Sequence, residues 1–227
     1  MRKEEIASLI VYLLMIAVAI IVGLSVITSA IQTCPPKMNN FLFVIIVIIV
    51  GLLFNVIMLE ILHMVGGIIG GYKVVFVNIL GFCFEKRDGK LSLKFKDFDG
   101  LTGETKIAPV KESASPRWYS LMPLIFYVVE TTILMVVFNV LSGFISSTPS
   151  TAGEQSMVLV RVMCILFVTI GGMLTLYNIF PAKLDTTTDG YRLSLLSKKE
   201  NVKAFNELMR IECAYAENQE LADMKVF

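Results

Sequence analysis

Two ionisable side chains lie inside a long apolar run and are the first candidates for chemistry. Glu60 and His63 are three residues apart, so they project from nearly the same face of a helix. Ionisable groups in such a run are costly and usually have a partner or a function. The pair is either a buried polar contact or part of a functional site. His63 and Cys83 could also form a cysteine nucleophile, because an imidazole activates a thiolate.

Four glycines follow His63 in two closely spaced pairs. They are Gly66, Gly67, Gly70 and Gly71, which form two overlapping patterns of small residues four positions apart. Such patterns let another helix or strand approach the backbone closely. Packing alone is sufficient to explain them, so the glycines do not decide between the two interpretations of the polar pair.

Two longer segments carry a resemblance to a known family. They are LEILHMVGGIIGGYKVVFVNILGF, which contains the polar pair and the glycines, and the later NIFPAKLDTTTDG. These segments resemble the site-2 protease family of intramembrane zinc metalloproteases, in its bacterial branch. There, a helix with the motif HExxH ends in glycines and is followed by a GYK segment. The resemblance covers most of the region from Gly51 to Leu196.

The resemblance implies roles for particular residues. In the family, two histidines and an aspartate hold zinc, and the glutamate is the general base. The glutamate corresponds to Glu60, the second histidine to His63, and the Asn-Pro turn to Asn178–Pro181. The aspartate after that turn corresponds to Asp189, with Asp185 as the competing choice.

The chain departs from the family pattern at two places. Leu59 stands where the family has its first histidine, and His63 is the single histidine of the chain. A catalytic zinc uses three protein ligands, so zinc binding here needs either a substitute ligand such as Cys83 or Asp185, or an extra water. In the third apolar run, LMPLIFY keeps Pro123 but lacks the family's asparagine, which is thought to hold the substrate backbone.

Three functions therefore stay open. The preferred prediction is a pseudoprotease that binds a membrane-embedded peptide or partner protein without cutting it. One alternative is an active zinc metalloprotease of atypical ligation, which uses Glu60, His63 and Asp189. The other is a non-enzymatic membrane protein, either a transporter accessory or an immunity-type factor. Enzymatic activity is left undecided.

Long apolar runs must position these residues. Hydrophobic residues make up 56% of the chain, and the mean hydropathy is +0.74. Four runs are long enough to cross about 30 Å of hydrocarbon. They predict an all-α polytopic membrane protein with helices at about 6–31, 41–66, 118–145 and 157–180. The membrane domain is expected to cover residues 1–190, and a tail to cover 191–227.

Loop charges predict the orientation of these helices in the cell membrane. The segment between the second and third runs carries nine basic residues, whereas the loop 146–156 carries none. By the positive-inside rule, that segment and both termini are cytosolic. The net charge is only +1, which gives no case for nucleic-acid binding. The lipid bilayer is the expected surrounding.

A small sheet and a tail helix complete the predicted architecture. Residues 90–96 alternate between polar and apolar after Asp88-Gly89, which is typical of a β-hairpin with an upstream strand at 82–87. Residues 72–80 are a further strand candidate within the cytosolic segment 71–117. In the tail, Ser197 and Glu200 have the spacing of a capping box, which predicts an amphipathic helix.

Overall fold

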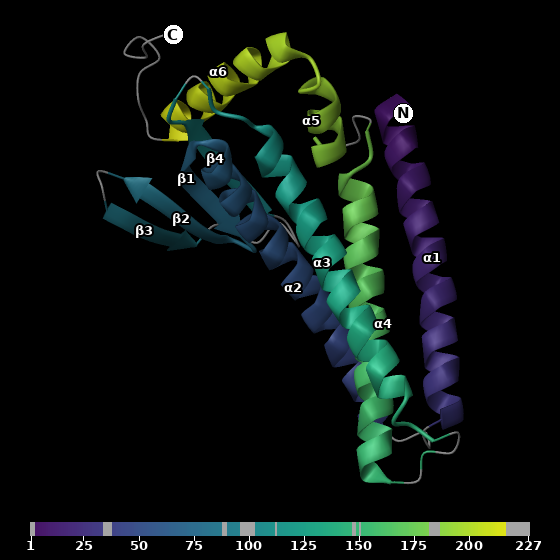
Figure 1. Ribbon diagram of the computed structural model, residues 1–227. Coiled ribbons are helices and arrows are strands. Elements are labelled where there is room, and N and C mark those ends of the chain that lie inside the picture. The colour runs from purple at the N-terminus through teal and green to yellow at the C-terminus, as the bar shows by residue number, and fades with distance from the viewer. Residues whose placement is uncertain are drawn as a thin grey trace. The chain divides into compact units, whose positions relative to one another are not determined.

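A computed structural model describes residues 3–33, 38–87, 90–95, 103–111, 113–146, 149, 151–181 and 187–216 (Figure 1). Its elements follow in the order α1 (Lys3–Thr33), α2 (Met38–Gly70), β1 (Tyr72–Ile79), β2 (Phe82–Arg87), β3 (Lys90–Phe95), β4 (Gly103–Pro109), α3 (Arg117–Ser142), α4 (Ala152–Asn178), α5 (Asp189–Leu195) and α6 (Lys199–Ala216). The chain forms two compact units. The first holds the described residues up to Asn55 and from Phe126 to Asn178, and the second holds the others.

The prediction of four long apolar helices is confirmed. Among the described residues, four helical segments are long and apolar enough to cross a membrane: Glu5–Ser25, Phe41–Gly70, Arg117–Ser142 and Ala152–Asn178. The largest extensions beyond the predicted bounds are at the end of α2, which reaches Gly70, and at the start of α4, which begins at Ala152.

A capping box explains the early start of α4. The Thr151 hydroxyl accepts a hydrogen bond from the Glu154 amide at 3.2 Å, and the Glu154 carboxylate accepts one from the Thr151 amide at 3.1 Å. These reciprocal bonds satisfy amide groups that the first helical turn leaves without partners. The predicted boundary at residue 157 was based on the apolar run alone, and the cap begins the helix five residues earlier, at Ala152.

The first unit has an apolar core to which α1, α2 and α4 contribute. Val47, Val162 and Leu166 are buried together, and Val22 packs against them. Near the other end of α1, the hydroxyls of Tyr12 and Tyr177 are 3.2 Å apart. These contacts join helices that are far apart in the chain.

Glu130 of α3 and Arg161 of α4 lie within the long apolar helices of this unit. The Arg161 guanidinium lies over the ring of Phe138, 4.3 Å from its centroid. No ion pair between Glu130 and Arg161 occurs within the described part of the chain.

The second unit contains a four-stranded antiparallel sheet with the order β3-β2-β1-β4. The predicted hairpin is present, and its strands pair from Phe82 opposite Phe95 to Arg87 opposite Lys90. The expected turn at Asp88-Gly89 lies outside the described residues. A second tight turn joins β1 to β2 through Leu80 and Gly81, which both have positive φ angles, of 53° and 86°. That pattern matches the type I′ turn that suits antiparallel neighbours.

Both faces of this sheet region are used to hold helices. Tyr72, Ile107, Ala114 and Tyr119 form one buried cluster, against which Met209 of α6 packs. Val75, Ala108 and Cys213 form a second, smaller cluster between the sheet and α6. The predicted tail helix therefore has a partner within its own unit, namely the sheet.

Polar contacts anchor α6 to the same region. The Tyr72 hydroxyl donates a hydrogen bond to the Asn206 side-chain oxygen, and the Asn206 amide donates to the Ala114 carbonyl at 3.3 Å. Burial raises the pKa of Tyr72, so its hydroxyl keeps its proton and remains a donor. The Ser197 hydroxyl donates to the Ser194 carbonyl at 2.7 Å, in the turn before α6, so the predicted capping box is not the contact that Ser197 makes.

The short helix α5 was not predicted from the sequence, and one glycine permits its position. Gly190 lies so close to the main-chain carbonyl of Ile179 that a Cβ atom at this position would overlap it. Thr188 caps the helix, because its hydroxyl accepts a hydrogen bond from the Tyr191 amide at 3.2 Å and donates one to the Phe180 carbonyl at 2.8 Å. The chain that leaves α4 is thus tied to the start of α5.

Replacing Gly190 with alanine should destabilise the protein. The added methyl group has no room beside Ile179, and overpacking of this kind costs about 1–3 kcal/mol. The thermal unfolding midpoint in detergent should fall for Gly190→Ala. The matched control is Gly23→Ala, where an added Cβ has no heavy atom within 4 Å. Equal midpoints for the two variants would contradict the close approach of α5 to Ile179.

Candidate functional site

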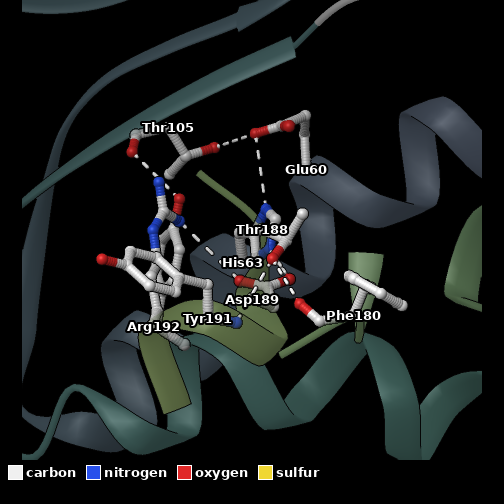
Figure 2. Close-up of polar contacts among 9 residues, drawn as sticks. Glu60, His63, Thr105, Phe180, Thr188, Asp189, Tyr191 and Arg192 are labelled. Atoms are coloured by element: carbon white, nitrogen blue, oxygen red, sulfur yellow. Dashed lines mark hydrogen bonds and ion pairs between the residues drawn. The ribbon is translucent and has the colours of Figure 1, made fainter. Parts of the chain in front are cut away.

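Two residues that are 126 positions apart meet in the second unit. His63 Nε2 lies 2.8 Å from Asp189 Oδ2 (Figure 2). His63 is near the end of α2, and Asp189 is the first residue of α5. Their exposed fractions are only 6% and 3%. The structure therefore brings together the histidine and the aspartate that the resemblance paired, and it buries both.

Glu60 lies one helical turn before His63 and faces the side of the imidazole ring opposite to Asp189. Glu60 Oε2 is 3.8 Å from His63 Nδ1 and accepts a hydrogen bond from the Thr105 hydroxyl at 2.6 Å. Thr105 belongs to β4, so this strand determines where the Glu60 carboxylate lies (Figure 2). The two carboxylates thus face different nitrogens of one imidazole.

An aromatic ring covers the imidazole. The ring of Tyr119 is stacked on that of His63, with centroids 4.4 Å apart and planes inclined by 5°. The Tyr119 hydroxyl donates a hydrogen bond to the main-chain carbonyl of Thr105 at 3.3 Å. The Arg192 guanidinium also lies over the Tyr119 ring, 5.4 Å from its centroid.

Electrostatics keep Asp189 ionised. Burial by itself raises the pKa of this carboxyl, but neighbouring His63 and Arg192 outweigh burial and hold the pKa below its usual range. Arg192 Nη1 lies 3.7 Å from Asp189 Oδ1, one turn further along α5. Asp189 also lies at the N-terminal end of this helix, where a negative charge is favoured.

The other residues singled out from the sequence lie in different places. Asn178 ends α4, and Pro181 follows at a bend, whereas Asp185 lies outside the described residues. The alternative pair of His63 with Cys83 does not appear among the described contacts: the Cys83 thiol donates to the Gly81 carbonyl at 3.8 Å, and the His63 ring nitrogens face Asp189 and Glu60.

The described residues do not fit a catalytic zinc site. His63 and Asp189 supply two adjacent donor atoms, but Leu59 has no donor atom and Glu60 faces the other ring nitrogen. Across the described ranges, no group of three His, Cys, Asp or Glu side chains is arranged to hold one metal ion. A catalytic zinc is normally bound by three protein ligands. The arrangement is instead a buried hydrogen-bonded cluster that connects α2, β4, α3 and α5.

Sequence reasoning missed three members of this cluster. Thr105, Tyr119 and Arg192 each contact one of the ionisable residues or the imidazole ring. The spacing of Arg192 three residues after Asp189 on a helix was a usable signal, because such positions are neighbours on one face. Thr105 and Tyr119 gave no signal, since their contacts depend on how β4 and α3 pack.

Removing the Thr105 hydroxyl should destabilise the cluster. Thr105→Val keeps the side-chain shape but leaves a buried oxygen of Glu60 without its donor, which costs about 1–3 kcal/mol. Thermal unfolding in detergent measures the loss. The control is Thr132→Val, because Thr132 is exposed and its hydroxyl bonds only to the Val128 carbonyl of its own helix. A similar small effect at both positions would show that Glu60 does not depend on β4.

Comparison of the chain with known proteins identifies no relative. No family model, no curated protein and no solved structure matches the chain. The resemblance to site-2 proteases therefore depends on the residues themselves: the Glu60 and His63 pair, the glycines after it, and the later aspartate.

Proposed function

We propose that the chain is a membrane-embedded pseudoprotease of the site-2 type, which holds an extended peptide segment without cleaving it. The four long apolar helices support a place in the membrane. The contact between His63 and Asp189 supports the likeness to the protease architecture, because the residues matched to the two ends of the family motif lie side by side. Leu59 supports the loss of peptidase activity.

The main support for peptide binding is the exposed apolar face of the β2–β3 hairpin. Phe82 pairs with Phe95, and Phe84 pairs with Leu93, so all four side chains lie on one face of the two strands. Their exposed fractions range from 38% to 73%. Contiguous exposed apolar surface of this kind usually marks an interaction site.

The position of β3 at the end of the sheet supports the same function. β3 pairs with β2 alone in the described sheet, so its outer edge can accept another strand. Exposed edges with apolar faces promote unwanted pairing, and proteins usually protect them unless they serve recognition. A peptide that adds to this edge gains main-chain hydrogen bonds from β3 and apolar contacts from Leu93 and Phe95.

The polar cluster has a supporting role in this proposal. Glu60, His63 and Asp189 are engaged with neighbouring side chains and are almost fully buried. Removing one member of a buried ion pair costs about 3–5 kcal/mol, because the remaining charge loses its partner. The cluster therefore stabilises the sheet and helices that present the hairpin, and it does not need to activate water.

Purified protein should contain much less than one zinc ion per chain. The physical reason is that the described donor set is one ligand short of the three that a catalytic zinc uses. Elemental mass spectrometry of protein prepared without chelators measures the content. His63→Ala and Asp189→Ala serve as controls for metal bound elsewhere. About one zinc per chain that is lost in both variants would instead support an active metalloprotease.

Peptide capture should depend on the apolar face of the hairpin. The probe is a labelled single-span peptide with a central Gly-Pro segment, which cannot remain helical, reconstituted with the protein in nanodiscs. It should bind and remain uncut. The double variant Leu93→Ser and Phe95→Ser should weaken its binding about tenfold or more, because two exposed apolar contacts are lost.

Leu208→Ser is the matched control, because Leu208 is a similarly exposed apolar residue but lies on α6. It should leave peptide affinity unchanged. Equal affinity in the hairpin variant and the wild type would exclude the hairpin as the binding surface. Cleavage of the probe that disappears in Glu60→Gln would show an active peptidase in place of a pseudoprotease.

A further inference from the structure

We infer that Tyr119 is the positioning residue for His63, because its ring fixes the plane in which the imidazole must lie. The inference concerns the orientation of one side chain within the second unit and is independent of whether the protein binds peptides. Neither Tyr119 nor its role follows from the resemblance. The resemblance assigns the ligand and base roles to residues of α2 and of the segment after α4, and on α3 it concerns Pro123 and a missing asparagine.

The stacking geometry restricts rotation of the imidazole. At a centroid separation of 4.4 Å and an inclination of 5°, the two rings lie face to face. Rotation of the His63 ring about its Cβ–Cγ bond would turn its edge into the Tyr119 ring. The stacked orientation is the one in which Nε2 lies 2.8 Å from Asp189 Oδ2 and Nδ1 faces Glu60.

Tyr119 is itself held from several sides. It is buried, and its hydroxyl donates to the Thr105 carbonyl at 3.3 Å. Thr105 therefore contacts both Tyr119 and Glu60, since its carbonyl accepts from the Tyr119 hydroxyl and its own hydroxyl donates to Glu60 at 2.6 Å. The Arg192 guanidinium lies 5.4 Å from the Tyr119 ring centroid, which adds an attractive cation–π contact. Arg192 also lies near Asp189, which belongs to the same helix, α5.

One glycine on α2 makes the stacking possible. Gly66 lies so close to the main-chain carbonyl of Trp118 that a Cβ atom there would overlap it. This close approach brings the first turn of α3 against α2, three residues after His63. Tyr119 follows Trp118 in the chain. The close approach of the α2 and α3 backbones at Gly66 and Trp118 therefore places the Tyr119 ring beside the imidazole.

The single histidine of the chain provides a direct test. Protein labelled with carbon-13 and nitrogen-15 only at histidine gives the ring signals of His63 and no others. A stacked tyrosine shifts the ring protons of His63 upfield through its ring current. Tyr119→Phe keeps the aromatic ring and should retain this shift. Tyr119→Leu should lose the shift and should also broaden or divide the nitrogen signals, because the imidazole samples more than one orientation.

A second measurement uses the unmodified protein, in case the leucine variant does not fold. Ring protons of tyrosine and His63 should show a direct nuclear Overhauser effect, because the two rings are 4.4 Å apart. No such effect in the wild type would overturn the inference. Signals of His63 that are the same in Tyr119→Leu and wild type would also overturn it. Both measurements are made without peptide, so they stay valid if the proposed peptide binding fails.

Discussion

The second unit depends on one requirement, which is that an ionised group taken out of water must be given partners. Asp189 is 3% exposed, and burial alone disfavours its charged form. The contacts of Asp189 with His63 and Arg192 replace the hydration that its carboxylate loses on burial, and each contact constrains the fold. His63 brings the end of α2 to the start of α5, while Arg192 requires α5 to continue for at least one helical turn. Around this contact, Thr105 ties β4 to α2 through Glu60.

The general architecture was readable from the sequence because apolar length and alternation are local properties. Four long helices and the 82–95 hairpin follow from runs of residues that are contiguous in the chain. The strand β4 did not follow, since Gly103–Pro109 lacks the regular polar-apolar alternation of β3 and becomes a strand by pairing with β1. The helix α5 did not follow either, because seven residues are too few to show a helical period. Its position depends on Thr188 and Gly190 meeting the chain that leaves α4.

The candidate site likewise contains some residues that the sequence indicates and others that only the structure shows. Glu60 and His63 stood out because charge is unusual within an apolar run, and Asp189 was found through a motif. The contact between His63 and Asp189 agrees with that motif, while their chemical roles remain proposals. Tyr119 and Thr105 are common residue types at unremarkable positions, and only packing makes them neighbours of His63. A sequence reveals residues that are out of place, whereas it conceals ordinary residues whose importance comes from their surroundings.

The separation of 126 residues between His63 and Asp189 has a consequence for biosynthesis. A ribosome adds about 5–20 residues per second, so His63 is made roughly 6–25 seconds before its carboxylate partner on α5. Until then, α2 carries a polar side chain within an apolar segment without the contact that later buries it. During this interval, Glu60, one turn away on the same helix, is the ionisable neighbour that His63 already has. Assembly of the cluster is therefore a late event in the life of the polypeptide, completed after α4 has been synthesised.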